Sequence, residues 1–530
     1  MKKLQHTVLL LAALWSASSC SLLDTESQDF IDPKEYYKTE AQLQAALNGV
    51  YATLAQTSLY GAMMLGRMGL SADIGYEAYA VDEGTVGYYD VTPADSKIRN
   101  YWRDLYDGIG RANLLLESIH KPEMDEAERD NIRGQALFLR AYYHFLLTIR
   151  FGDVPLVLKT PESGKLSDVR IPQTPQREVY LKAIEDMETA AELVKPIGEV
   201  ESGGRISRSA VHGILARVCL YMAGDPVNEP GMYAKAKQHA AAVIGMGYHA
   251  LNASYQQVFI NYIQDKYDTR ESIFEVEFYG NNVGTYTTTA GQVGRNNGIK
   301  FTNTDLPEVG YSIGSIRATP YFFQLFDDDD ERRDWSIAPY TLSDTGEKET
   351  VSANNMWIRF CGKFRREYEL ITPKSTTNTS TNFPILRYSD VLLMYAEAVA
   401  ADPGSDATEL AQAYEYVNKV RRRGYGRDLN APAEGVDLPV EGAVSLLSAV
   451  KDERARELGH ELLRKDDLIR WGEFYDRMQS VRGTVPETYT SAYYVAARLY
   501  YGNVQRRDVL WPIPTYELSV NPYLVQNNGW

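Results

Sequence analysis

The chain is poor in the residues that catalytic and metal sites require. Its 530 residues include only three cysteines and seven histidines, and neither type recurs at the spacing of a metal site. No HExxH, GxSxG or phosphate-binding glycine motif occurs. Carboxylate pairs for glycoside hydrolysis need only be close in space, so the sequence does not identify any. We therefore expect no catalytic residue, no metal ligand and no cofactor, and a protein that is not an enzyme.

The chain also has no net positive charge and no apolar run long enough to span a membrane. The formal net charge of −16 argues against a nucleic-acid partner, whose phosphates need a basic footprint, and against attraction to anionic lipid. The apolar run Val8 to Ala17 is too short to span a membrane. Because Lys2 and Lys3 precede it and small residues follow it, it predicts a signal peptide over residues 1–19.

Tyrosine, by contrast, is abundant. The chain has 38 Tyr against 15 Phe and 7 Trp. A ring with a polar tip suits a wet binding surface, where one end packs and the other forms hydrogen bonds. The alternative is that most of these rings fill helical cores, and for the majority we expect that.

Helical periodicity dominates the chain from Glu40 onward. Apolar residues recur at helical spacing from Leu43 to Leu54. We expect further helices near residues 100–119, 126–151, 176–194, 207–222, 232–244, 390–400, 408–423, 442–458 and 462–477. They come mostly as pairs, and Trp102 and Ala136 are separated by the tetratricopeptide period. This predicts helical hairpins packed side by side.

The most sharply defined helix lies in Leu386 to Ala398, where apolar residues follow one another almost without a break. Such a helix is buried on all sides, and we expect Ser389 to cap its start. Glu397 is a buried carboxylate that needs a partner. A catalytic acid is one interpretation, but we favour a structural ion pair with an arginine of the run 421–423.

Two long regions of different composition interrupt the helices. Residues 69–97 are rich in Gly, Tyr and Asp, and residues 250–384 are rich in Asn, Thr and Gly with one clear strand at Ser272 to Phe278. Loops this long inside a compact body are usually functional or disordered, and the aromatic content favours order.

Three further segments carry a family resemblance. LRYSDVLLMYAEA, DLIRWG at Asp467 to Gly472 and LWPIPTYELSVNPYLVQNNGW at Leu510 to Trp530 closely resemble the C-terminal signature of the SusD/RagB family of Bacteroidetes outer-membrane lipoproteins. Tyr36 to Leu54 and Gln135 to Val157 also resemble family segments. The resemblance implies a mainly α fold: a right-handed superhelix of tetratricopeptide-like hairpins with long loop-rich insertions and a few short strands.

The resemblance also implies a domain plan. A SusD-like domain would span residues 36–530, with scaffold helices at about 36–250 and 385–480, ligand-surface insertions at about 69–97 and 250–384, and the C-terminal signature at about 386–530. Ala17-Ser18-Ser19-Cys20 looks like a bacterial lipobox, which implies lipidation of Cys20 and a tether over residues 20–35. The acidic residues at 24, 26 and 29 resemble the surface-export signal of such lipoproteins.

The function that the resemblance implies is capture of oligosaccharide outside the cell and its delivery to a SusC-like TonB-dependent transporter in the outer membrane. Exposed aromatic faces and short polar groups suit sugar binding. From the two insertions we therefore predict these ligand contacts: Asp73, Tyr76, Tyr79, Tyr88, Tyr89, Tyr286, Asn296, Tyr311, Arg317 and Trp335. Peptide capture on a RagB-type scaffold, a surface glycosidase and a pure scaffold remain alternatives.

The acidic run Asp327 to Asp330 could hold a structural calcium ion. Arg332 stands where an EF-hand loop needs glycine, so we favour a solvated charged turn.

Cys219 lies in a helical apolar context typical of a buried thiol. An exported compartment permits a disulfide between Cys219 and Cys361, and the sequence does not decide.

Overall fold

The computed structural model describes residues 36–78, 86–163, 165–200, 202–352 and 355–530. The predicted signal peptide, Cys20 and the tether over residues 20–35 lie outside this part of the chain. Within it, helices dominate and the strands are short, which confirms the predicted fold class.

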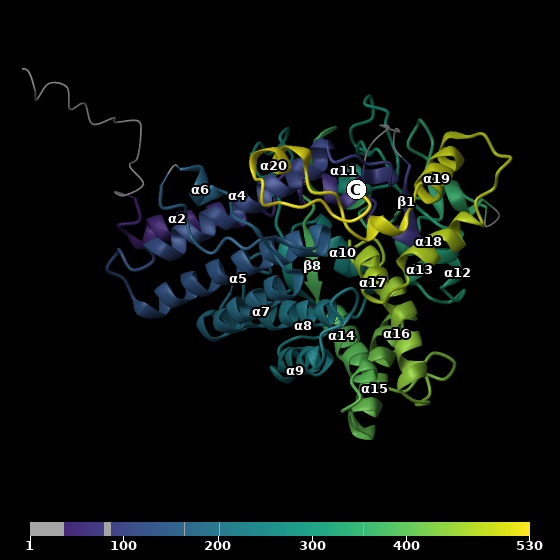
Figure 1. The fold of residues 1–530 in the computed structure, drawn as a ribbon. Coiled ribbons are helices and arrows are strands. Elements are labelled where there is room, and N and C mark those ends of the chain that lie inside the picture. Colours follow the sequence, from purple (N-terminus) through teal and green to yellow (C-terminus); the bar gives the residue numbers. More distant parts are fainter. Residues whose placement is uncertain (1–35, 79–85, 164, 201, 353–354) are drawn as a thin grey trace, which may run out of the picture.

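The scaffold is an array of long helices, each packed on the next (Figure 1). Contacts run from α4 to α5, then to α7, α8 and α9, and α14 packs against α9, α15 and α16. The bounds of the array are α2 Glu40–Tyr51, α4 Ser96–Ser118, α5 Glu126–Phe151, α7 Gln176–Leu193, α8 Arg208–Ala223, α9 Met232–Gly245, α14 Tyr388–Ala401, α15 Ala407–Gly424 and α16 Ala443–Leu458. The predicted hairpins packed side by side are present.

Shorter elements lie in the two insertions, in the C-terminal part of the chain and in connections between the long helices. The helices are α3 Met63–Gly66, α6 Leu166–Val169, α10 Tyr255–Ile263, α11 Val293–Asn297, α12 Pro320–Gln324, α13 Arg332–Ser336, α17 Arg464–Arg470, α18 Phe474–Arg482, α19 Ala492–Gly502 and α20 Thr515–Val520. The 3₁₀ turns are η1 Ala72–Ile74, η2 Val86–Tyr88, η3 Ile197–Glu199, η4 Met356–Ile358, η5 Arg366–Tyr368 and η6 Arg506–Val509.

The strands form four antiparallel pairs among the described residues. They are β1 Gly75–Glu77 with β5 Ile316–Ala318, β2 Val154–Pro155 with β3 Gln173–Thr174, β4 Ser272–Val276 with β8 Phe383–Arg387, and β6 Tyr340–Leu342 with β7 Lys348–Thr350. The predicted strand at 272–278 is therefore β4. Its partner β8 leads directly into α14 and so places the second insertion against the helical array.

Local sequence explains where several helices begin and end. Asp125 caps α5 by accepting hydrogen bonds from the N–H groups of Ala127 and Glu128. Two predictions are wrong. Ser389 lies inside α14 and accepts a bond from Arg387, which occupies the N-cap position. The expected helix at 462–477 is broken into α17 and α18 because Gly472 adopts a φ of +72°.

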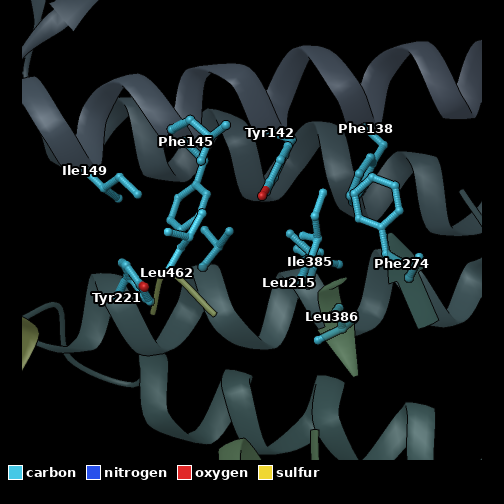
Figure 2. Packing of buried hydrophobic residues seen from close by; sticks show 14 of the residues in the cluster. Phe138, Tyr142, Phe145, Ile149, Leu215, Tyr221, Phe274, Ile385, Leu386 and Leu462 are labelled. Carbon is cyan, nitrogen blue, oxygen red and sulfur yellow. The ribbon is translucent and has the colours of Figure 1, made fainter. Parts of the chain in front are cut away.

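The hydrophobic core runs between α5, α8 and the β4–β8 pair (Figure 2). The Phe138 ring of α5 meets the Phe274 ring of β4 edge to face, with centroids 5.9 Å apart. Gly213 lets α8 approach the sheet, because a Cβ at this position would lie 2.3 Å from Leu386. Large aromatic rings and a close-packed interior make this contact a major stabilising one.

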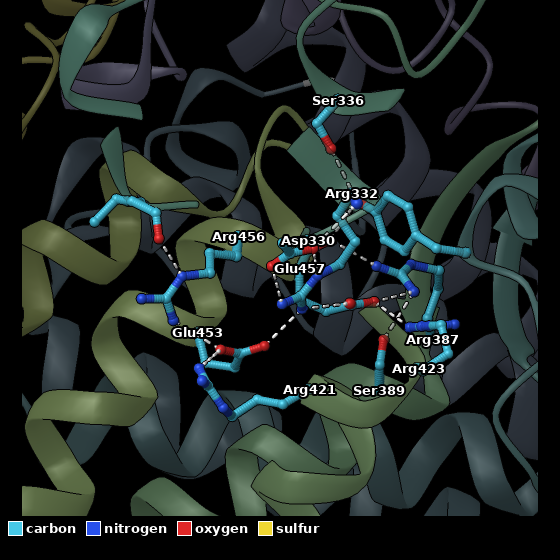
Figure 3. Close-up of polar contacts among 12 residues, drawn as sticks. Asp330, Arg332, Ser336, Arg387, Ser389, Arg421, Arg423, Glu453, Arg456 and Glu457 are labelled. Carbon is cyan, nitrogen blue, oxygen red and sulfur yellow. Dashed lines mark hydrogen bonds and ion pairs between the residues drawn. The ribbon is translucent and has the colours of Figure 1, made fainter. Parts of the chain in front are cut away.

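A second interior cluster is ionic (Figure 3). Glu457 of α16 is fully buried and accepts hydrogen bonds from Arg387 (2.9 Å), Arg423 (2.5 Å) and Arg332 (3.3 Å). These arginines come from β8, α15 and α13. Removing one partner from such a buried group leaves uncompensated charge, which is strongly destabilising. Because the partners come from the second insertion and from the helical array, the cluster holds the two together.

Glu397 is in an ion pair, as expected, but with a different partner. Its carboxylate accepts bonds from Arg470 (2.8 Å at the longer contact) and from the indole N–H of Trp471 (2.8 Å). The arginines at 421–423 pair instead with carboxylates of α16 and neighbouring loops. The prediction of a structural ion pair is confirmed and the predicted partner is wrong, because α17 rather than α15 faces this turn of α14.

The acidic turn is less solvated than expected. Asp330 and Arg332 are buried and joined by two hydrogen bonds of 2.9 and 2.7 Å, whereas Asp328 is exposed and pairs with Arg333. The turn is charged, as predicted, but Asp330 and Arg332 belong to the buried ionic cluster and not to a solvated surface.

The two remaining cysteines, Cys219 and Cys361, are buried free thiols, so the disulfide that the sequence left open is absent. Within the described ranges, every helix is either too short or too polar to cross a membrane.

Glu457→Gln tests the ionic cluster. Loss of this carboxylate leaves three buried guanidiniums underpaired, and we expect the free energy of unfolding to fall by about 3–5 kcal/mol. Urea denaturation measures it. The control is Glu162→Gln, whose pair with Lys159 is exposed on both sides and whose loss costs below about 1 kcal/mol. Equal losses of stability in the two variants would contradict a major stabilising role for the Glu457 cluster.

Acid should weaken the same cluster. Burial alone would raise the pKa of Glu453, but Arg332, Arg456 and Arg421 outweigh it and lower the pKa from 4.5 to about 2. A lowered folded-state pKa gives stability that is present above pH 4.5 and is lost as the pH falls toward 2. The melting temperature of the wild type should therefore fall as the pH is lowered from 4.5 to 2. The fall should be less steep in Glu453→Gln. An unchanged slope in the variant would rule out this carboxylate as a cause.

Candidate functional site

The two insertions meet at the β1–β5 ladder. Tyr76 of β1 pairs in register with Arg317 of β5, and α19 of the C-terminal segment packs against β1. Residues far apart in the sequence thus share one surface region (Figure 1). Of the predicted ligand residues, these two are brought together.

Six of the predicted contacts lie in the interior. They are Asp73, Tyr76, Tyr88, Tyr89, Asn296 and Trp335, each at most 3% exposed. A sugar needs a ring face or a polar group that reaches the surface, so as direct contacts in this structure these six predictions are wrong. In the first insertion the reason is that α17, α18 and α19 cover it, and in the second it is that Asn296 and Trp335 pack under their own loops.

Each of these buried groups has a structural contact instead. Asp73 accepts two hydrogen bonds of 2.8 Å from Arg464. The Tyr76 hydroxyl donates to the carbonyl of Trp357 at 2.7 Å, and the Tyr89 hydroxyl donates to Gly69 at 2.6 Å. Tyr88 belongs to the same buried cluster.

In the second insertion, the Asn296 amide donates to the Ala62 carbonyl at 3.1 Å. The Trp335 ring packs under the Arg365 guanidinium, 4.5 Å from its centroid. Both side chains therefore support loops of the insertion from within.

The other four predicted residues differ from one another. Tyr286 is 79% exposed on a loop of the second insertion. Tyr311 is half-buried, with the Arg295 guanidinium over its ring at 5.9 Å. Arg317 is half-buried at the ladder. Tyr79 lies outside the described residues and stays a prediction.

A cleft of about 340 Å³ opens beside Arg317, and we call it the Arg317 cleft. Its walls come from β5, the β6–β7 hairpin, η4 and α19, with Lys300, Arg317, Asp344, Phe360 and Tyr493 among its lining residues. It contains apolar rings, two cations, hydroxyl side chains and one carboxylate. This combination of an apolar wall with a few polar groups is typical of small-ligand sites.

Arg317 is held between two rings. Its guanidinium lies 4.1 Å from the Phe360 centroid and 5.2 Å from the Tyr493 centroid, and it donates to the Ile358 carbonyl. Its Nε is buried and has no partner in the described part of the chain, whereas its Nη2 makes no hydrogen bond to the described residues and stays available on the cleft side. Burial lowers the pKa of this guanidinium despite Tyr76 and Tyr493 nearby. The group is fixed in position and keeps hydrogen-bonding capacity for a ligand.

Tyr493 extends this wall into an aromatic strip, which we define as Tyr489, Tyr493 and Tyr494. The ring centroids of Tyr493 and Tyr494 are 4.6 Å apart, and those of Tyr489 and Tyr494 are 4.8 Å apart. Tyr489 is 54% exposed and Tyr493 is half-buried. Such rings offer flat faces to the C–H face of a sugar.

Our sequence reasoning missed this strip because it lies outside both insertions. A signal was present: five tyrosines fall between residues 489 and 501. Tyr500 and Tyr501 of this group are buried against β1, and they anchor α19 so that the start of the helix faces the cleft.

A larger cavity of about 400 Å³ lies between the helical array and the C-terminal segment. Ile149, Phe474, Val509 and Leu510 give it mostly apolar walls. Two of its charged residues, Asp466 and Arg470, are already in buried ion pairs. Its lining is more apolar than that of the Arg317 cleft.

Comparison with known proteins finds related family models over both halves of the chain. The model described as "SusD family" matches residues 270–530, and the model described as "Starch-binding associating with outer membrane" matches residues 23–220. SusD-like protein P2 of Formosa agariphila is 27% identical over the whole of this chain and 99% of its own length.

Solved structures agree in fold. A SusD homolog from Bacteroides thetaiotaomicron superposes with a TM-score of 0.85 at 27% identity and covers 95% of this chain and 100% of its own. Surface glycan-binding protein A from the same organism, solved in complex with laminarihexaose, gives a TM-score of 0.70 at 20% identity over 93% and 100% of the two chains. With both halves of the sequence matched and the predicted signature segments in place, the chain belongs to the SusD/RagB family.

Proposed function

We propose that this protein is a cell-surface glycan-binding lipoprotein, and that it captures oligosaccharide at the Arg317 cleft and passes it to a SusC-like TonB-dependent transporter. The observation that carries the proposal is the position of an incompletely bonded Arg317 beside Tyr493, whose half-buried ring lines the cleft and leads to the exposed ring of Tyr489. The family match and the laminarihexaose complex of a structural relative support a sugar as the ligand class.

The residues that line the cleft suit binding of a sugar and not its hydrolysis. Asp344 is the one carboxylate among its lining residues, whereas glycoside hydrolysis uses two, flanking the scissile bond. Rings with hydroxyl tips and a positioned guanidinium can orient a sugar and release it unchanged. The rigid α-helical array is then free to supply the surface for the transporter.

Peptide capture is the competing function, because tyrosine rings and an arginine also suit a peptide backbone. Calorimetric titration of the mature protein with neutral and acidic oligosaccharides, and separately with peptide digests, distinguishes the two. Saturable heat from sugars supports the proposal, and heat from peptides alone overturns it.

Tyr493→Ala tests the cleft itself. Loss of the ring removes a stacking face and the cation–π partner of Arg317, contributions of about 1–2 kcal/mol together, so we expect oligosaccharide affinity to fall about 5- to 30-fold. Calorimetry measures it, and circular dichroism checks the fold. The control is Tyr523→Ala, which removes an exposed ring (59%) near β3, away from the cleft. Loss of affinity in the control alone would move the site away from the cleft.

Cys20→Ser tests the lipid anchor. Without the thiol no acyl chains can be attached, and stable membrane association needs more than one chain. We expect the wild-type protein in the membrane fraction, accessible to protease on intact cells, and the variant in the soluble or secreted fraction. A variant that stays with the membrane would show that Cys20 is not the anchor.

A further inference from the structure

A second cavity, of about 230 Å³, adjoins the Arg317 cleft. Leu342 of β6 lines both spaces, so they share the β6–β7 hairpin as a common wall. We call this space the Lys374 cavity after its most unusual residue. Four cations and two carboxylates line it.

Lys374 is a buried cation without a partner. The residue is only 8% exposed, and its ammonium makes neither a hydrogen bond nor an ion pair with any residue that the structure describes. Burial is the main reason that its pKa is lowered, although Glu369 opposes the effect from a distance. Burying an unpaired charge is unfavourable, so an anion that enters the cavity would be strongly favoured.

The backbone around Lys374 is adapted to this arrangement. Gly310 has a φ of +94°, and a Cβ there would lie 3.0 Å from the Lys374 side chain and 3.1 Å from that of Arg366. The glycine therefore makes room for the lysine stem at the cavity wall. Tyr311, one of the residues predicted from sequence, follows directly in the chain.

Arg365 is a second cation that has no carboxylate partner among the described residues. It is 8% exposed, and its Nε donates to the Gly362 carbonyl at 2.9 Å while its Nη2 donates to the Trp335 carbonyl at 3.2 Å. The guanidinium rests on the Trp335 ring. Its Nη1 has no bond to the described residues, so a fixed guanidinium edge remains for a ligand.

The other charged groups of the cavity are already neutralised or lie at its edge. Lys348 pairs with Glu367 at 2.8 Å, and Arg366 pairs with Glu369 at 2.8 Å. Glu308 is exposed at the rim. Two cations of the Lys374 cavity and Arg317 of the adjoining cleft therefore remain without a carboxylate partner.

This pattern is unusual for the chain. Its net charge is −16, and buried arginines of the helical core such as Arg387 and Arg470 have two or more carboxylate contacts. Lys465 of α17 is also buried without an ion pair to any described residue, but it lies against the rings of Tyr89 and Phe474. Arg317, Arg365 and Lys374 instead line two neighbouring cavities of one insertion. Charge-assisted hydrogen bonds to anionic oxygens are stronger than neutral ones.

We propose that the glycan is anionic: a sugar ring occupies the Arg317 cleft and a carboxylate or sulfate substituent enters the Lys374 cavity, where Lys374 and Arg365 bind it. This inference rests on the proposed function and specifies its substrate class. The cavity volume exceeds the roughly 30 Å³ that one water occupies in the liquid, so a carboxylate or sulfate group fits.

The experiment is calorimetric titration of the mature protein with oligogalacturonate as the carboxylate probe, a chondroitin sulfate oligosaccharide as the sulfate probe and laminarihexaose as the neutral probe. We expect at least one acidic probe to bind more tightly than the neutral one. Its affinity should fall between about 50 and about 500 mM NaCl by more than that of the neutral probe, because salt screens the attraction between an approaching anion and the cations of the cavity. The two acidic probes show which anionic group is preferred.

Lys374→Met is the decisive variant. It should weaken binding of the acidic probe about 10-fold or more, leave the affinity for laminarihexaose unchanged, and leave the melting temperature equal or higher because an unpaired buried charge is removed. Lys374→Arg should restore part of the affinity. Lys159→Met, a change at an exposed lysine, is the matched control.

The outcomes separate this inference from the proposed function. If laminarihexaose binds and the acidic probes bind no better, or if Lys374→Met leaves acidic binding unchanged, the inference is wrong and glycan capture stands. If no sugar of either kind binds, both are wrong. A salt-sensitive acidic interaction lost in Lys374→Met and kept in Lys159→Met supports both.

Discussion

The ionic cluster around Glu457 is the constraint on which the rest of the molecule depends. One fully buried carboxylate of α16 is contacted by arginines of β8, α15 and α13 (Figure 3). Those elements belong to the helical array and to the long second insertion. Because a buried charge must keep its partners, the insertion is held in one position on the scaffold, and the loops that it carries can form a defined surface.

That surface reverses the charge pattern of the interior. In the helical core, buried arginines such as Arg387 and Arg470 contact two or more carboxylates, and burial lowers the pKa of His144 to about 4. At the hairpin of β6 and β7, Arg317, Arg365 and Lys374 lack carboxylate partners. Rings of Tyr493, Phe360 and Trp335 fix or border these cations. Positive groups without a carboxylate partner among the described residues thus lie beside aromatic rings where the two insertions meet.

The helical array could be predicted closely from the sequence. The expected helix at 126–151 coincides with α5, and that at 408–423 differs from α15 by one residue at each end, because apolar periodicity reports burial directly. The break at Gly472 was missed, since a glycine in a helical pattern does not by itself predict a positive φ, and Asp225, which lies where a Cβ at 472 would be, comes from elsewhere in the chain. The partner of Glu397 was missed for the same kind of reason: tertiary packing chose α17.

The candidate site was far less accessible to prediction. Tyrosines of the first insertion looked like surface rings, yet α19 covers them, and Tyr493, which faces the cleft, is a helix residue more than 100 positions after the last predicted contact. Arg317 was predicted and lies in the cleft, but the contacts that hold it come from Phe360 and Tyr493. Such a site is built by the pairing of β1 with β5 and the docking of α19, and no local pattern specifies those contacts.

A crystal structure of the mature protein with a bound acidic oligosaccharide would test the central claim most directly. We predict a sugar ring against Tyr493 with a hydroxyl near Arg317, and the anionic substituent within hydrogen-bonding distance of Lys374. An oligosaccharide bound at a face that contains neither Arg317 nor Tyr493 would contradict it.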